Sequence, residues 1–438
     1  MRRKIAAVSL VSMLIPFLGV RAAPAGMADL ARQALSGTPA ESADAVAALR
    51  QAGPAGMEAM LAACKDGSCG EALDRVCGVH DCPDIRLFWY TDLDAAKAAA
   101  RATGKPILSL RLMGRLDEEF SCANSRFFRT VFYNNREINQ ILRDRYVLHW
   151  RSVRPVPKVT IDFGDGNRLE QTLTGNSIHY VLDSRGRLLE PLPGLYGPAA
   201  FRSALDRIEQ AARTAARLDD AEFARWITAR HQKQLYDRAT AFDRALANLP
   251  PEPLPPAPPA PAPDPAIATV PAARDPWAVL QTAPGVLTDR LNVGGLETGS
   301  KSAGERSILQ ALLDVGDDQL RALAPLHRIR IHLDPASRDF LLRKQGITDP
   351  QEAKRLVDAF ETTVALDEVI NEYRTRPAIL KALSDPKVQA GLELETFNRW
   401  VYEDVFRTPL SDPWLGLAPK DVYGALPASA RTAAVPKP

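Results

Sequence analysis

Four short apolar runs between residues 105 and 196 constrain the fold of this 438-residue chain more than any other feature of its sequence. They cover residues 107–112, 146–153, 178–182 and 187–192, with polar or turn-forming residues on either side. Runs of this length with such borders favour β-strands over helices. Because helical patterns lie before, between and after them, we expect an α/β fold.

The helices of this region carry their own start and stop signals. An Ala-rich helix at residues 93–103 has Asp92 in the N-cap position and Gly104 just past its end. Two further helices are expected, at residues 135–143 and 201–217. Between the second and third apolar runs, residues 158–174 predict an added hairpin, because apolar and polar residues alternate around a Gly-Asp-Gly-Asn turn.

A lone cysteine follows the first apolar run, in a Cys-Ala-Asn-Ser sequence that begins at Cys122. The order of strand, cysteine, helix, strand and hairpin resembles the thioredoxin-like family, and the Lys-Pro pair before the first strand is similar to its exported members. That family places C-x-x-C at the start of its first long helix. The resemblance therefore makes Cys122 the nucleophile position and Ser125 the position of the resolving thiol. It also implies a cis-proline just before the third strand, where this chain has Ser177.

The resemblance implies a more limited thiol chemistry than that of a C-x-x-C protein. A thiol attacks only as its thiolate, and a helix N-terminus favours negative charge by about 0.3–1 kcal/mol. We therefore expect a modestly acidified Cys122 near the surface, above the ends of the first and third strands. Because the Ser125 hydroxyl cannot resolve a mixed disulfide, any exchange would stop at that stage.

The first residues predict a secretion signal. Three basic residues follow Met1, residues 5–20 are apolar, and a small-residue cleavage site places the cut after Ala22. The alternative is a membrane anchor, but the apolar run is shorter than the ~20 residues that span a bilayer. We expect a soluble exported protein, periplasmic or secreted, with no membrane span once the signal is removed.

Four cysteines lie close together in the sequence, at Cys64, Cys69, Cys77 and Cys82. The oxidising compartment of an exported protein favours two disulfides among them, and four cysteines allow three pairings. Two thiols five residues apart on a helix would point ~140° apart, so a local bridge needs a turn. Zinc is the alternative, although zinc sites typically have shorter C-x2-C spacing.

Composition divides the chain into a series of segments. We expect a signal peptide at 1–22, a helical cysteine-containing prefix at 23–84, the thioredoxin-like domain at 85–217, a helix at 218–249, a Pro/Ala-rich linker at 250–276, a mostly helical C-terminal domain at 277–426 and a disordered tail at 427–438. The linker holds 12 of the 35 prolines, largely alternating with alanine, which favours an extended spacer. We expect it to separate two independently folding units.

The net charge and the motifs of the chain limit the functions that we consider to three. A net charge of +2 gives no field that would draw the chain to nucleic acid, and no motif calls for a cofactor. One hypothesis is monothiol disulfide exchange, or thiol-mediated partner binding, through Cys122, and the enzyme in that case would be a thiol-disulfide oxidoreductase. A second is a non-catalytic interaction module with a protein partner, and a third is a metal or nucleophile site that joins Cys122 to His149 and His179. An exposed Cys122 favours the first hypothesis and a buried one the second.

Overall fold

The computed structural model describes residues 25–64, 69–172, 176–249 and 309–411. The expected signal peptide, Pro/Ala-rich linker and C-terminal tail lie outside the described residues. Contacts divide the chain into two compact units, Met1–Cys69 and Gly70–Pro438.

The described part of the first unit consists of three helices. They are α1 (Ala25–Ser36), α2 (Pro39–Gln51) and α3 (Pro54–Ala63), which confirms the helical pattern expected at the start of the prefix. Thr38 and Glu41 form a capping box at the start of α2. Gly53 turns the chain into α3 with a φ of 66°. The two helices approach so closely that a Cβ at Gly56 would overlap the carbonyl oxygen of Leu49, so only glycine fits there.

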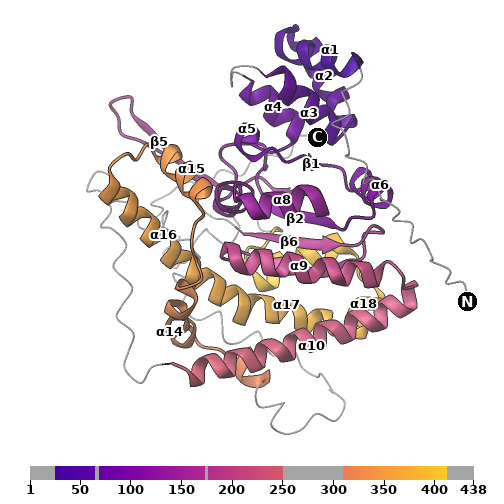
Figure 1. Cartoon of the computed structure of the whole chain (residues 1–438). Coiled ribbons are helices and arrows are strands. Elements are labelled where there is room, and N and C mark those ends of the chain that lie inside the picture. Colours follow the sequence, from indigo (N-terminus) through magenta and orange to yellow (C-terminus); the bar gives the residue numbers. More distant parts are fainter. Residues whose placement is uncertain (1–24, 65–68, 173–175, 250–308, 412–438) are drawn as a thin grey trace, which may run out of the picture. The chain divides into compact units, whose positions relative to one another are not determined.

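A five-stranded mixed sheet organises the second unit (Figure 1). Its strands are β1 (Trp89–Tyr90), β2 (Ile107–Met113), β3 (Val147–Arg154), β6 (Ser177–Leu182) and β7 (Leu188–Pro193), in the spatial order β1-β3-β2-β6-β7. The first three strands run parallel, whereas β6 is antiparallel to β2 and β7 is antiparallel to β6. The α/β class is confirmed, and so are the four apolar runs as strands. β1 escapes sequence reasoning because two residues are too few to leave a pattern.

Helices connect and cover these strands. In chain order they are α4 (Gly70–Cys77), α5 (Cys82–Ile85), α6 (Leu93–Thr103), α7 (Ala123–Phe127), η1 (Phe128–Phe132), α8 (Arg136–Arg145), α9 (Pro198–Ala215) and α10 (Asp220–Ala247). The expected ends of α6 are confirmed: the Asp92 carboxylate accepts from the N–H of Ala95, and Gly104 adopts the left-handed conformation with a φ of 72°.

The side chains of the sheet alternate between its two faces, and each face has a different cover. On one face His179 packs against Phe128 of η1 and Phe201 of α9. On the opposite face Tyr180 donates a hydrogen bond to Asn398 Oδ1 (3.1 Å), which belongs to the C-terminal part of the chain. In Figure 1, α8 and α9 accordingly lie on one side of the sheet and the yellow C-terminal helices on the other.

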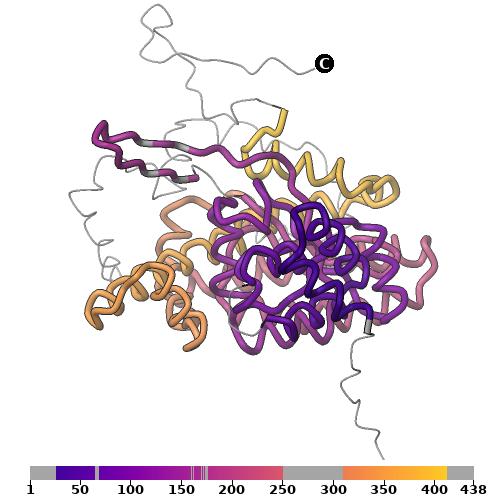
Figure 2. Tube along the Cα trace, turned by 90° about the horizontal axis from the view of Figure 1, so that it is seen from above, coloured from indigo at the N-terminus to yellow at the C-terminus, as the bar shows by residue number. Residues whose placement is uncertain are grey.

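A hairpin stands between β3 and β6. Its strands β4 (Lys158–Asp162) and β5 (Arg168–Thr172) form a two-stranded sheet of their own, as the alternating sequence predicts. Figure 2 shows it as an arm that extends from the body of the unit. Because this described part of the connection brings no helix onto the sheet, one face of the sheet is left for a later part of the chain to cover.

The C-terminal helices belong to the same compact unit as the sheet. They are α14 (Asp317–Arg328), α15 (Pro335–Gln345), α16 (Pro350–Ile370), η2 (Asn371–Thr375), α17 (Arg376–Leu383), α18 (Pro386–Ala390), α19 (Leu394–Trp400) and η3 (Val401–Val405). One hydrophobic core contains Leu235 and Phe242 of α10 together with Leu320 of α14 and Tyr373 of η2. The structure thus differs from the expected separation into independent units, because helices before and after the Pro/Ala stretch share this core.

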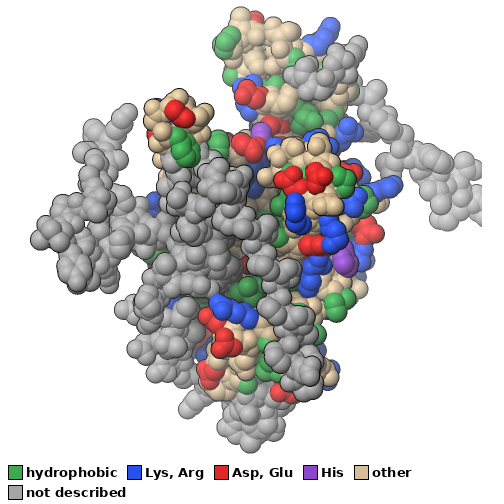
Figure 3. Space-filling view, turned by 90° about the vertical axis from the view of Figure 1, so that its left-hand side faces the viewer, with side chains coloured by type: hydrophobic (Ala, Val, Ile, Leu, Met, Phe, Trp, Pro, Cys, Tyr) green, Lys and Arg blue, Asp and Glu red, His purple; other side chains and the backbone are tan. Residues whose placement is uncertain are grey.

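Charged side chains of both signs are interspersed among the described residues on the face drawn in Figure 3. This distribution agrees with a net charge of only +2. Within the described ranges, no helix is long and apolar enough to cross a membrane.

Candidate functional site

Cys122 lies just beyond the end of β2, at the start of α7. Its backbone N–H donates to the carbonyl oxygen of Met113 (3.3 Å), the last residue of the strand, and it is the N-cap residue of α7. Ser177 begins β6 directly opposite Leu112. The structure therefore places Cys122, Ser125 and Ser177 at the same end of the sheet.

The Cys122 thiol is completely buried, with 0% of the residue exposed. It donates a hydrogen bond to Ser125 Oγ (3.5 Å), and the Ser125 hydroxyl donates to the carbonyl oxygen of Cys122 (2.7 Å). Burial raises the pKa of the thiol and outweighs the opposing effects of Ser125, Met113 and Arg126. The expectation of an acidified Cys122 near the surface is wrong, because desolvation disfavours the thiolate more than a helix N-terminus favours it.

Residues 394–408, near the end of the described part of the chain, lie over this end of the sheet, and we call them the C-terminal cover. Tyr402, which is fully buried, donates a hydrogen bond to the carbonyl oxygen of Asn176 (3.0 Å). Asn176 Nδ2 donates in turn to Thr408 Oγ1 (2.6 Å). Burial, followed by the neighbouring Cys122, raises the pKa of Tyr402. The backbone just before Ser177 is thus occupied by the chain itself.

A buried arginine anchors the C-terminal cover to the middle of the sheet. Arg111 of β2 has no exposed side-chain surface, and its NH2 lies 2.7 Å from Glu395 Oε1 of α19. Its NH1 donates to Ser109 Oγ (2.7 Å), which is hydrogen-bonded to His149 Nδ1 (2.7 Å). A charged residue inside an apolar run signals a buried partner. The local sequence does not identify that partner, because it lies 284 positions away.

His149 and His179 do not form a site with Cys122. In the strand register, His149 lies opposite Ser109 and His179 lies opposite Leu110, so their side chains leave the sheet on opposite faces. Burial lowers the pKa of each imidazole to about 3, which keeps both neutral at physiological pH. The hypothesis of a shared metal or nucleophile site is therefore wrong.

The four clustered cysteines form two local disulfides. Cys64 is bonded to Cys69 in the first unit, with a Cα–Cα distance of 5.8 Å, and Cys77 to Cys82 in the second, at 6.3 Å. The turn expected inside the first pair lies outside the described residues. A disulfide leaves no thiolate for zinc, which the alternative hypothesis requires. Cys122 is the free thiol.

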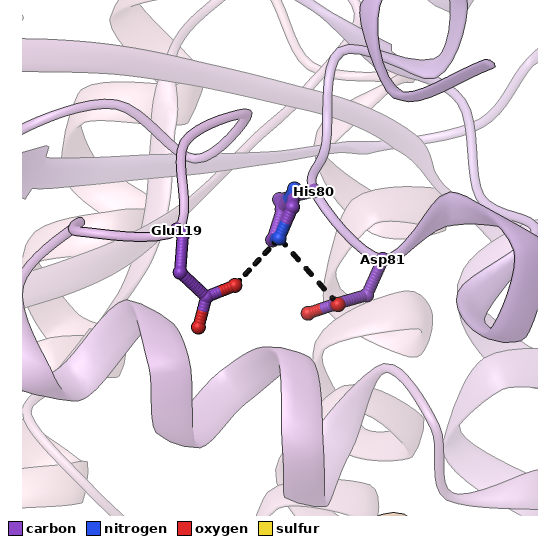
Figure 4. A group of neighbouring side chains, drawn as sticks. All are labelled: His80, Asp81 and Glu119. Carbon is purple, nitrogen blue, oxygen red and sulfur yellow. Dashed lines mark ion pairs between the residues drawn. The ribbon is translucent and has the colours of Figure 1, made fainter. Parts of the chain in front are cut away.

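A second polar cluster surrounds His80, inside the loop that the Cys77–Cys82 disulfide closes (Figure 4). His80 Nδ1 lies 2.7 Å from Asp74 Oδ2, and its Nε2 lies 2.6 Å from Glu119 Oε2 and 3.7 Å from Asp81 Oδ1. Asp74 first and Glu119 second raise the pKa of His80 to about 9. The hydrogen bond from His80 lowers the pKa of Glu119 to about 2. His80 is therefore an imidazolium at neutral pH.

The cluster has the ligand types of a metal site, but its charges are already balanced. Ligand atoms of His80, Asp81 and Glu119 lie within 4.8 Å of one another. Lys344 Nζ of α15 lies 2.6 Å from Asp81 Oδ1 and 3.3 Å from Glu119 Oε2. Arg129 NH1 lies 3.1 Å from Asp81 Oδ2. These three cations balance the three carboxylates, so the arrangement is an ion-pair network that fastens α15 to the disulfide loop.

No family model, curated protein or solved structure matches this chain. The fold and the sites define an α/β protein with a mixed sheet, one buried free thiol and two local disulfides. The site at Cys122 is covered by the chain's own C-terminal residues, and the cluster at His80 is neutralised by the chain's own cations.

Proposed function

We propose that this chain is an exported, thioredoxin-like protein that acts as a non-catalytic interaction module, with its thiol site closed by its own C-terminal cover. The observation that carries the proposal is the complete burial of Cys122. Thiol-disulfide exchange requires a thiolate that can reach its partner. Here the thiol is shielded from solvent and its pKa is raised by burial.

The strand order supports the thioredoxin-like part of the proposal. The order β1-β3-β2-β6-β7, with three parallel strands followed by two antiparallel ones, agrees with the resemblance seen in the sequence. The hairpin β4–β5 is a departure from that pattern. The C-terminal cover compensates for it by packing on the face that the hairpin leaves open.

The contacts of the C-terminal cover support the non-catalytic part. The resemblance places the substrate-docking backbone at Ser177, and the preceding Asn176 is hydrogen-bonded to both Tyr402 and Thr408. A partner peptide would have to displace these contacts before it reached Cys122. Ser125 in the position of the resolving thiol excludes a dithiol cycle in any case.

Export is supported by the two local disulfides and by the signal pattern of the first 22 residues. Structural disulfides persist in oxidising compartments and are rare in the cytosol. Sequencing the mature N-terminus tests this part of the proposal, and Ala23 is the first residue expected. Recovery of an intact Met1 terminus in a membrane fraction would contradict it.

Alkylation of the native protein tests the closed site. Mass spectrometry would follow the reaction of Cys122 with a maleimide in the folded protein and in urea. We expect the folded protein to react at least ~100-fold more slowly, because the thiol is reached only through an opening that costs ~2.7 kcal/mol or more. Tyr402→Ala removes the contact with Asn176 and should speed the native reaction. Tyr236→Ala, on α10, is the matched control and should not.

The outcomes separate the two hypotheses for the thiol. A native Cys122 that reacts as fast as it does in urea would be an accessible nucleophile, and the monothiol exchanger would then replace the module. Slow native labelling that Tyr402→Ala accelerates supports the closed site.

A further inference from the structure

A groove of about 590 Å³ lies between α9 and α10, within the size range of small-molecule sites. In Figure 1, α10 follows directly after α9, and the two helices diverge from their junction. Three buried or half-buried residues from other elements also line it, Glu190 of β7, Glu372 of η2 and Arg376 of α17. The groove shares no residue with the Cys122 site or the His80 cluster.

Its deepest part is a network of ion pairs. Glu190 is fully buried and accepts hydrogen bonds from Arg376 and from Arg230 NH2 (3.3 Å). Glu372 lies 3.3 Å from Arg376 NH1 and 3.0 Å from Arg238 Nε. Burial would raise the pKa of Glu190, but the surrounding cations, Arg376 first, bring it down to about 2. Both carboxylates are therefore engaged in holding β7, α10 and α17 together.

The groove contains more cations than its carboxylates can pair. Its basic side chains are Arg207, Arg230, Lys233, Arg238 and Arg376, and its acidic ones are Glu190, Asp237 and Glu372. Lys233 and Asp237 pair with each other at 2.7 Å. Four guanidinium groups and two carboxylates remain, an excess of two positive charges. A concave surface with such an excess concentrates anions.

Hydrogen-bond donors are in excess as well. Each guanidinium carries five N–H groups, and the buried Nε atoms of Arg230 and Arg376 have no hydrogen-bond acceptor among the described residues. Arg207 of α9 is exposed, and within the described part of the chain its hydrogen bond goes to Ser203 Oγ (3.2 Å) rather than to a carboxylate. Trp226 lines the same groove, with its ring 5.9 Å from the Arg230 guanidinium.

We propose that this groove binds a small molecule through an anionic group, a carboxylate or a phosphate, held by Arg207 and Arg230. Guanidinium groups suit both anions because they present paired N–H donors in one plane. Trp226 offers an apolar surface to the rest of the ligand. Binding here is independent of the state of Cys122.

Titration calorimetry on the full-length mature protein tests the proposal, with inorganic phosphate and succinate as probes at constant ionic strength. We expect saturable binding of at least one probe. Arg207→Gln and Arg230→Gln should each weaken it about tenfold, the effect of losing one charge-assisted hydrogen bond. Arg213→Gln is the matched control and should leave the affinity unchanged, because Arg213 is an exposed residue of α9 that pairs with Glu209, outside the groove.

The arms of the experiment identify the ligand class. Binding of phosphate alone assigns a phosphate-bearing ligand, and binding of succinate alone assigns a carboxylate-bearing one. Because Arg207 is exposed, Arg207→Gln should fold like the wild type, which circular dichroism would check. Absence of saturable binding of both probes up to the millimolar range would overturn the proposal. So would binding that neither glutamine variant weakens.

Discussion

His80→Gln should destabilise the second unit near neutral pH but not at high pH. The pKa of His80 is raised from 6.5 to about 9, by Asp74 first and Glu119 second. A group with a raised folded-state pKa contributes fully below its unfolded pKa, and the contribution is lost as pH rises through about 9. For Glu119, whose pKa is lowered from 4.5 to about 2, the contribution is complete above 4.5 and is lost as pH falls through 2. The network therefore stabilises most between pH 4.5 and 6.5.

The structure sets the size of this effect. The pKa difference between 6.5 and about 9 corresponds to ~3.4 kcal/mol at 1.36 kcal/mol per unit. The His80 and Glu119 side chains keep 27% and 49% of their surface exposed, so solvent screens the pair. We therefore expect a loss of ~1–2 kcal/mol in the free energy of unfolding. Most of it should come from the hydrogen bond to Asp74, whose side chain is only 9% exposed.

Urea unfolding of the wild type and His80→Gln at about pH 6 and about pH 10 measures the effect. The wild-type advantage should be ~1–2 kcal/mol at the lower pH and close to zero at the higher one. His332→Gln is the control, because His332 is 71% exposed, and it should cost nothing at either pH. A cost of His80→Gln that is equal at the two pH values, or larger at high pH, would refute the reasoning.

Three further predictions follow from the core and the thiol site. Ser125→Cys should close a disulfide with Cys122, because the Ser125 oxygen lies 3.5 Å from the Cys122 sulfur. The variant should still fail to reduce insulin, since the site is buried. Appreciable insulin reduction would contradict the closed site. Glu395→Ala should lower the free energy of unfolding, measured in urea, by ~3 kcal/mol, because it leaves the buried Arg111 without its carboxylate. Arg111→Met should lower it by less. The reverse order would show that the ion pair is not buried. Phe132→Ala should lower the free energy of unfolding by ~3–5 kcal/mol, because this ring is fully buried and stacks on Phe201 with a centroid distance of 4.1 Å. A loss below ~1 kcal/mol in the same assay would contradict that packing.

Local features of the fold can be predicted from the sequence because their causes lie within a few residues. The cap and end of α6 follow from Asp92 and Gly104, and the start of α10 follows from the capping box of Asp219 and Glu222. The hairpin β4–β5 follows from alternation around its turn. The domain boundaries could not be predicted in this way, because proline content marks a spacer but does not reveal whether the helices on either side share a core.

The state of the candidate site depends on residues far from it. The position of Cys122 after β2 can be predicted, since it depends on the order of neighbouring elements. Its burial cannot, because it depends on Tyr402 and the rest of the C-terminal cover. Arg111, inside an apolar run, was the one local sign that something distant packs on that face. The groove between α9 and α10 escapes sequence reasoning altogether, since its arginines are ordinary surface-type residues until the two helices are placed together.

Closure of the sheet by the C-terminal cover also imposes an order on folding. Glu395 meets Arg111 across 284 positions of sequence, and Asn398 meets Tyr180 across 218. Contacts this distant form late, because loop-closure entropy has to be overcome before they stabilise anything. A chain made from its N-terminus therefore keeps one sheet face unfinished, and open to aggregation, until α19 and η3 have been synthesised. Products that stop before residue 394 cannot complete that face, so α19 and η3 act as a check that synthesis has passed this point.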